Sequence, residues 1–195
     1  MTARAGMATL INDLRAACAA GTADYLLGTV PYWTDDQLQA ELDRTQRIYH
    51  YLVLKPIPEY INGQMQWFQY GVPEQLGTYL EEDGSGTGGW AVKDNSGGTI
   101  PIGNYAVNYQ AGLVTFPSDQ KGSVYFLDAR TYNLNRAAAN VWRWKASRVA
   151  NRVDWSSDNH KISASQERQT ALEMATYYSG IAGPVSSVFV RTDEA

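Results

Sequence analysis

The sequence is poor in the residues that most often bind metals or form crosslinks. Its 195 residues include one cysteine, Cys18, and two histidines, His50 and His160. A single cysteine cannot form an internal disulfide bond, and a structural zinc site needs more nitrogen or sulfur ligands than these residues supply. We therefore expect no metal and no cofactor, a buried place for Cys18 in an alanine-rich helix, and ordinary structural roles for both histidines.

Long apolar runs and catalytic motifs are also missing. No stretch approaches the roughly eighteen consecutive apolar residues of a membrane span, and no apolar segment of a signal peptide follows the first residues. The sequence contains no Gly-x-Ser-x-Gly nucleophile motif and no Gly-Lys-Ser/Thr phosphate-binding motif. These absences predict a protein that is not an enzyme and that makes no contact with a membrane.

Two neighbouring features resemble binding motifs, but their context favours a hairpin tip. Residues 84–89 have the glycine spacing of a dinucleotide fingerprint, yet residues 90–93 are typical of a strand and not of the helix that this motif requires. Glu81, Glu82 and Asp83 come directly before the glycines. We interpret this acidic cluster as a solvated hairpin end, in preference to a cation site or a pair of glycosidase carboxylates.

Helical periodicity occurs towards both ends of the chain. Residues 9–20 predict a first helix that ends at Gly21, and a second begins at Thr34, where Gln37 completes a capping box, and runs to about residue 48 or 49. A third helix is predicted over residues 131–153 and a fourth over residues 163–180, closed by Gly180, with a loop over residues 154–162 between them.

The middle of the chain has the pattern of short strands. Aromatic and β-branched segments alternate with turn signals such as Asn62-Gly63, which predicts antiparallel hairpins. The predicted strands cover residues 51–55, 64–70, 77–81, 89–93, 105–110, 113–117 and 123–127. The fold class is therefore α+β, a four-helix bundle with an inserted β-hairpin region and an extended tail. The single domain would comprise N-terminal helices (1–50), a β-insertion (51–128), C-terminal helices (129–180) and a tail (181–195).

Charge is distributed unevenly along the chain. The formal net charge is −4, yet residues 130–168 carry a net charge of +5, so the rest of the chain is strongly acidic. Such a dipolar molecule favours oriented contacts with partners. It lacks the uniformly basic surface of a protein that binds nucleic acid tightly.

The predicted helix over residues 131–153 carries the most informative pattern. Projected at about 100° per residue, one arc is apolar and predicts the core face; it comprises Ala138, Ala139, Trp142, Ala146, Val149, Ala150 and Val153. Basic residues flank this arc on both sides: Lys145, Arg148 and Arg152 on one, Arg136 and Arg143 on the other. Trp144 points away from the core arc, which indicates either an interface anchor or a side chain covered by the β-insertion.

The C-terminal half resembles the head–tail connector proteins of tailed bacteriophages. The resemblance rests on residues 112–116 (GLVTF), 125–128 (YFLD), 132–142 (YNLNRAAANVW), 145–149 (KASRV) and 153–158 (VDWSSD), followed by a last helix. Residues 33–38 (WTDDQL) are loosely similar to the first helix start of the family. Residues 54–111 are longer than the corresponding part of the smallest members.

The resemblance implies a structural virion protein, assembled in the host cytoplasm and located at the head–tail interface. It would form a homo-oligomeric, dodecameric ring beneath the portal protein, extend the channel for double-stranded DNA without reading its bases, and provide a platform for tail-terminator, stopper or other tail proteins. Arg136, Arg143, Trp144, Lys145, Arg148 and Arg152 are the expected subunit interface. The tail residues Val185, Val188, Phe189, Val190 and Arg191 are expected to add a strand to the portal.

Two other interpretations stay open. The chain could be a different completion protein, either a stopper or a tail terminator. It could also be a receptor- or carbohydrate-binding module, in which aromatic residues of the β-insertion form a platform; the candidates are Trp67, Phe68, Tyr70, Tyr79 and Trp90. For these five residues we favour the core of a hairpin over an exposed platform.

Overall fold

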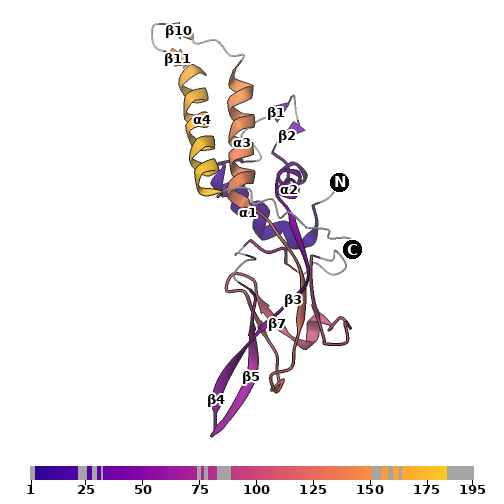
Figure 1. Ribbon diagram of the computed structural model, residues 1–195. Coiled ribbons are helices and arrows are strands. Elements are labelled where there is room, and N and C mark those ends of the chain that lie inside the picture. The colour runs from indigo at the N-terminus through magenta and orange to yellow at the C-terminus, as the bar shows by residue number, and fades with distance from the viewer. Residues whose placement is uncertain are drawn as a thin grey trace, which may run out of the picture. The chain divides into compact units, whose positions relative to one another are not determined.

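The structure is a computed structural model of a mixed α+β chain (Figure 1). It describes residues 3–21, 26–27, 30–31, 33–73, 76, 79–82, 89–150, 155–157, 160–162 and 164–183. Contacts divide the chain into two compact units, Met1–Ala137 and Ala138–Ala195. The first unit holds two helices and most of the strands, and the second is mainly helical. No helix among the described residues is long and apolar enough to cross a membrane.

The first helix is shorter than predicted because its chain reverses early. A 3-10 turn η1 (Ala5–Met7) leads into α1 (Ala8–Ala17), which buries Leu10, Ile11 and Leu14. Ala19 adopts a left-handed conformation with φ of 46°, and the amide of Ala20 reaches back to the carbonyl of Arg15. This pattern is a Schellman C-cap. It closes the helix before Gly21, so the predicted end at Gly21 was wrong, while the burial of Cys18 is confirmed.

The second helix begins as predicted and ends earlier. α2 (Asp35–Asp43) starts at Thr34, where both hydrogen bonds of the capping box with Gln37 are present. The predicted end at residue 48 or 49 was wrong, because Arg47–Val53 forms the strand β3. The Thr45 hydroxyl donates to the carbonyl of Leu42, a bond that marks where the helix gives way to the strand. Between α1 and α2, β1 (Leu26–Leu27) pairs with β2 (Val30–Pro31).

The first unit also contains two larger antiparallel sheets. One has the order β3-β9-β6, with β6 at Trp90–Lys93 and β9 at Phe126–Thr131. The other has the order β4-β5-β8-β7, with β4 at Lys55–Ile61, β5 at Gln64–Gly71, β7 at Ala106–Asn108 and β8 at Leu113–Thr115. Strands that are consecutive along the chain pair as predicted hairpins only in this second sheet, at β4–β5 and β7–β8. A second 3-10 turn, η3 (Ile102–Asn104), precedes β7. The β4–β5 hairpin extends beyond its neighbours, since β8 pairs only with residues 69–71 (Figure 1).

The strand β4 is an edge strand among the described residues, because only β5 pairs with it. It contains Pro56 and Pro58, which supply no amide hydrogen to a further strand. Its exposed side chains include Ile57 and Tyr60. The strand is therefore apolar but poorly suited to main-chain pairing along its free edge.

Both sheets contribute to one aromatic core. Tyr70 on β5 is fully buried and meets the rings of Phe116 and Tyr125 edge-on, at centroid distances of 5.5 and 5.1 Å. Phe116 and Tyr125 stack on each other at 4.7 Å. The remaining buried members of the core are Leu54, Leu76, Leu80, Trp90, Val92, Tyr105, Val114, Leu127 and Ala129.

The strand β3 contains a β-bulge between Tyr49 and Leu52. Tyr49 pairs with Ala129 and Leu52 with Leu127, so His50 and Tyr51 together oppose Asp128. Because of this extra residue, Tyr49 and Leu52 both pack against the core although they are three positions apart. Ile48, Tyr51 and Val53 remain exposed on the strand, which leaves apolar surface there without cover in the described residues.

The second unit contains a helix pair and a short hairpin. α3 (Leu134–Val149) begins three residues later than predicted, because Thr131 still belongs to β9 and Asn133 caps the helix by accepting from the amide of Arg136. α4 (Ala164–Ile181) continues through Gly180, so the predicted stop there was wrong. The segment predicted as a loop contains the paired strands β10 (Trp155–Ser157) and β11 (His160–Ile162). Ser163, where this helix was predicted to begin, lies outside the described residues.

The predicted core arc of α3 is confirmed in part. Ala138, Ala139, Ala146 and Val149 are buried, whereas Trp142 is half-buried and Ala150 is exposed. Ala137 and Val141 are buried as well and extend the arc to one side. Val153 lies outside the described residues.

The turn between β4 and β5 requires a glycine. Asn62 and Gly63 have φ values of 52° and 81°, a conformation in which a β-carbon costs about 1 kcal/mol. No atom lies within 4 Å of a β-carbon built on Gly63 or on Gly103, whose φ is not positive. We predict that Gly63→Ala lowers the free energy of unfolding by about 1 kcal/mol and that Gly103→Ala does not lower it. Chemical denaturation of both variants measures the difference; equal stabilities would contradict the turn geometry.

Candidate functional site

The predicted interface residues on α3 are placed unequally. Trp144 is 44% exposed and Arg143 is exposed, whereas Arg136, Lys145 and Arg148 are half-buried. α3 contains these four basic residues and no acidic residue. Its accessible surface is thus cationic around one large aromatic side chain. Arg152 and all five predicted tail residues, Val185, Val188, Phe189, Val190 and Arg191, lie outside the described residues.

Two of the basic side chains on α3 have partners within the second unit. The Arg143 guanidinium donates to the Ser179 hydroxyl of α4 at 2.7 Å and to the Asn140 side-chain oxygen at 3.3 Å. The Lys145 ammonium lies 4.8 Å from the centre of the Trp142 ring, a cation–π contact. Arg143 therefore links the two helices, and its remaining donors can serve a second partner.

The helix α4 adds exposed apolar side chains to the second unit. Tyr177 and Ile181 lie one turn apart and are both exposed, and Leu172 is exposed on another part of the helix. The buried positions Ala164, Ala171 and Ala175 are all small and share one stripe. This helix therefore carries apolar residues on more than one side.

A buried charge network lies in the first unit, where the sequence predicted a solvated hairpin end. Glu81 is fully buried, so that prediction was wrong for this residue. Its carboxylate accepts from Arg4 Nε at 3.1 Å and from the Tyr132 hydroxyl at 2.5 Å, and Arg130 lies 3.7 Å away. Asp83 and residues 84–88 lie outside the described residues, and Glu82 is half-buried.

Arg4 connects this network to α2. Its guanidinium forms two hydrogen bonds with Asp43, at 2.7 and 3.0 Å, and a third with the Tyr132 hydroxyl at 2.9 Å. The bond to Asp43 is the main reason that the pKa of Arg4 lies above its ordinary value, and the bond to Glu81 adds to it. Burial and the neighbouring Glu81 carboxylate raise the pKa of Tyr132 above its ordinary value. Both groups therefore keep their protons across the neutral range.

The segment 79–82 enters this network because the main chain fixes it against β9. The amide of Glu81 donates to the carbonyl of Arg130, and the amide of Tyr132 donates to the carbonyl of Tyr79. A β-carbon on Gly89 would lie 2.6 Å from the Glu81 carboxyl carbon. Only glycine therefore lets the chain pass the buried carboxylate at this point. Arg4 is far from Glu81 and Gly89 along the chain, so no local pattern in the sequence predicts that they meet.

A second polar cluster surrounds the β3 bulge. Asp128 accepts from the Lys93 ammonium at 2.6 Å and from the Tyr51 amide at 2.9 Å, and His50 Nδ1 lies 3.4 Å away. Burial acts to raise the pKa of Asp128, but the hydrogen bonds from Lys93 and Tyr51 lower it below its ordinary value. Lys93 also lies 4.2 Å from the centre of the Tyr51 ring. The cluster fixes the bulge and holds Tyr51 in its left-handed conformation, with φ of 53°.

The aromatic residues considered as a binding platform do not form one surface. Tyr70 and Trp90 are buried in the core of the first unit, which confirms the hairpin-core interpretation for these two. Trp67, Phe68 and Tyr79 are half-buried. Two of the five are therefore inaccessible to a ligand.

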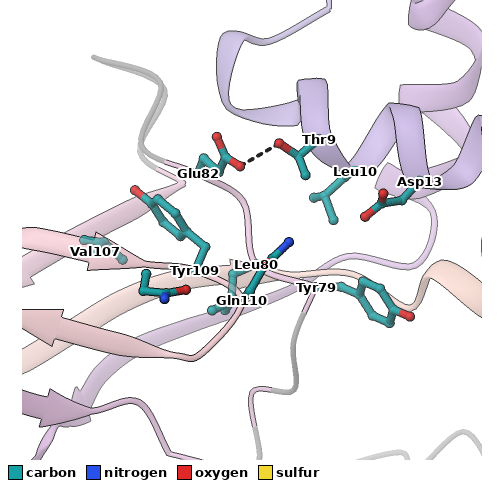
Figure 2. Close-up of a pocket in the computed structure, with 10 residues that line it drawn as sticks. Thr9, Leu10, Asp13, Tyr79, Leu80, Glu82, Val107, Tyr109 and Gln110 are labelled. Carbon is teal, nitrogen blue, oxygen red and sulfur yellow. Dashed lines mark hydrogen bonds between the residues drawn. The ribbon is translucent and has the colours of Figure 1, made fainter.

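An open groove of about 710 Å³ lies in the first unit between α1 and the sheet strand β7 (Figure 2). Leu10 and Leu80 provide apolar lining, and Tyr79 and Tyr109 add two phenol rings. The carboxylates of Asp13 and Glu82 also line it, whereas none of its described lining residues is basic. Glu82 accepts from the Thr9 hydroxyl at 2.6 Å, the bond drawn in Figure 2. We call this feature the acidic groove.

No group of three or more His, Cys, Asp or Glu residues within the described ranges is arranged to hold a metal ion. His50 is largely exposed beside Asp128, and His160 lies in β11. Comparisons with family models, with curated proteins and with solved structures each returned no match to the chain.

The buried carboxylate gives a direct test of the charge network. We predict that Glu81→Gln lowers the free energy of unfolding by about 3 kcal/mol, because Arg4 and Arg130 lose a fully buried counter-charge. Glu82→Gln is the matched control; it removes one charge from the adjacent, half-buried position and should cost less than about 1 kcal/mol. Denaturant unfolding measures both variants. Similar losses for the two would show that Glu81 has no special role.

Proposed function

We propose that the protein is a structural virion component that forms a ring between the portal and the tail of a tailed bacteriophage. The observation that carries this proposal is the surface of α3, which has four basic residues, no acidic residue and an exposed tryptophan. Large aromatic side chains and arginine are the residues most enriched at the centres of protein interfaces. Such a surface suits a repeated contact between subunits better than it suits free solvent.

Three further features support the same assignment. The sequence of residues 112–180 resembles the connector family, and α3 and α4 lie where two C-terminal helices were predicted. Exposed apolar side chains recur on β3, β4 and α4, in both units of the chain. The charge separation between residues 130–168 and the rest of the chain gives neighbouring subunits complementary surfaces.

In this proposal the helices contribute to the body of a dodecameric ring. Double-stranded DNA passes through the lumen without base readout, which agrees with a net-acidic chain that would not grip phosphates. The tail from Val185 to Val190 adds a strand to the portal, and the opposite side of the ring receives the stopper, tail terminator or tail. The protein acts through these surfaces rather than through catalysis.

A charge reversal on α3 tests the ring. We predict that Arg148→Glu combined with Arg152→Glu shifts the purified protein from rings to smaller species, because the contact loses its cationic side. The control combines Lys55→Glu with Lys121→Glu, which changes the net charge equally at exposed sites of the first unit. Mass measurement by light scattering, with electron microscopy of the particles, reads the result. Rings formed by the α3 variant as well as by the wild type would argue against this interface.

A truncation tests the role of the tail. We predict that removal of residues 182–195 leaves a protein with unchanged thermal unfolding that still forms rings but no longer joins heads carrying the matching portal. The physical reason is that strand addition supplies the main-chain hydrogen bonds of the portal contact. Pull-down with portal and electron microscopy of heads give the readout. Normal head joining by the truncated chain would exclude the tail as the portal contact.

A further inference from the structure

The acidic groove has the chemistry of a receptor for a cationic aromatic surface. Asp13 and Glu82 place two carboxylates on its lining, and its described lining residues contain no basic group to neutralise them. Tyr79, Val107 and Tyr109 contribute half-buried side chains to its lining, while Leu10 and Leu80, which also line it, are almost fully buried (Figure 2). Its volume of about 710 Å³ falls within the range of pockets that bury a ligand of moderate size.

The same chain carries a surface of the opposite kind. Trp144 on α3 is exposed. Arg148 follows it by one turn on the same face, and Arg143 precedes it by one residue, about 100° around the helix, where it also donates to the Ser179 hydroxyl. An indole with two flanking guanidiniums matches a groove that combines apolar and phenolic lining with two carboxylates. Guanidinium pairs well with carboxylate through parallel hydrogen bonds, and the indole face suits tyrosine and leucine side chains.

We propose that the acidic groove of one copy receives Trp144 of a second copy, with Arg143 and Arg148 of that copy facing Asp13 and Glu82. This contact rests on the proposed ring function and names the partner surface for α3. The groove lies in the first unit and Trp144 in the second, so the two surfaces differ. The contact is therefore heterologous, and each copy offers one groove and one α3 surface. Repetition of such a contact produces a closed ring when the rotation between copies closes.

Two variants that each remove one side of the contact test this proposal. Trp144→Ala removes the aromatic anchor, and Asp13→Lys combined with Glu82→Lys reverses the charge of the groove. Each variant alone should self-associate at least about tenfold more weakly than the wild type, as expected for loss of an interface anchor or its pocket. The full-length proteins are compared by sedimentation over a range of concentrations. Thermal unfolding midpoints confirm that both variants are folded.

A mixture of the two variants gives the sharper result. The groove variant retains Trp144, and the Trp144→Ala variant retains its groove, so one productive contact can form between them. The equimolar mixture should therefore contain heterodimers and no rings, while each variant alone stays monomeric. Tyr60→Ala and Glu59→Lys on β4 serve as matched controls, because they remove an exposed aromatic ring and reverse an exposed charge away from the groove. Both controls should form rings.

The outcomes separate this contact from the proposed function. If both variants form rings as readily as the wild type does, the groove contact is overturned and the proposed ring function is unaffected. Loss of rings in both variants without heterodimers in the mixture would also overturn the direct pairing of groove and Trp144. A wild-type chain that stays monomeric at every concentration would overturn the contact as well. The ring function would then be judged separately, from the mass of the complex that the wild type forms with portal.

Discussion

The first unit depends on one buried carboxylate. Glu81 alone in the described core is both fully buried and acidic, and three of its neighbours are cationic or phenolic: Arg4, Arg130 and Tyr132. Removing a charge from water is costly, and the cost is offset only if every partner stays in place. The network therefore fixes the N-terminal segment, α2, the segment 79–82 and the end of β9 with respect to one another. It also positions Leu80 and Glu82, which line the acidic groove, so the geometry of that surface follows from a charge inside the fold.

Local sequence signals were sufficient for the parts of the fold that local physics decides. The capping box at Thr34, the Asn62-Gly63 turn and the burial of Cys18 were all predicted from a few neighbouring residues. The end of α2 could not be predicted in this way, because helical periodicity continues past Asp43 while pairing with β9 draws residues 47–53 into a strand. Tertiary hydrogen bonds override a periodic pattern whenever they satisfy more of the backbone.

The candidate site was predicted only where it lies on a single helix. The basic residues around Trp144 share one element, so their grouping is visible in the sequence. The acidic groove is assembled from α1, the segment 79–82 and residues 107–110, which are distant along the chain. Its carboxylates were interpreted separately, and Glu82 was assigned to a solvated tip. The β3 bulge was invisible for a similar reason, since it arises from the register between β3 and β9 and not from the composition of β3.

The two prolines of β4 bear on how copies of the chain can meet along this edge of the hairpin. An exposed apolar edge is the usual starting point for fibre growth, because each added strand recreates the edge that received it. Pro56 and Pro58 interrupt the ladder of amide donors on which that growth relies. The prolines thus act against open-ended strand addition through this hairpin. A contact between copies along β4 would have to rely on side chains such as Ile57 and Tyr60 and not on the main chain.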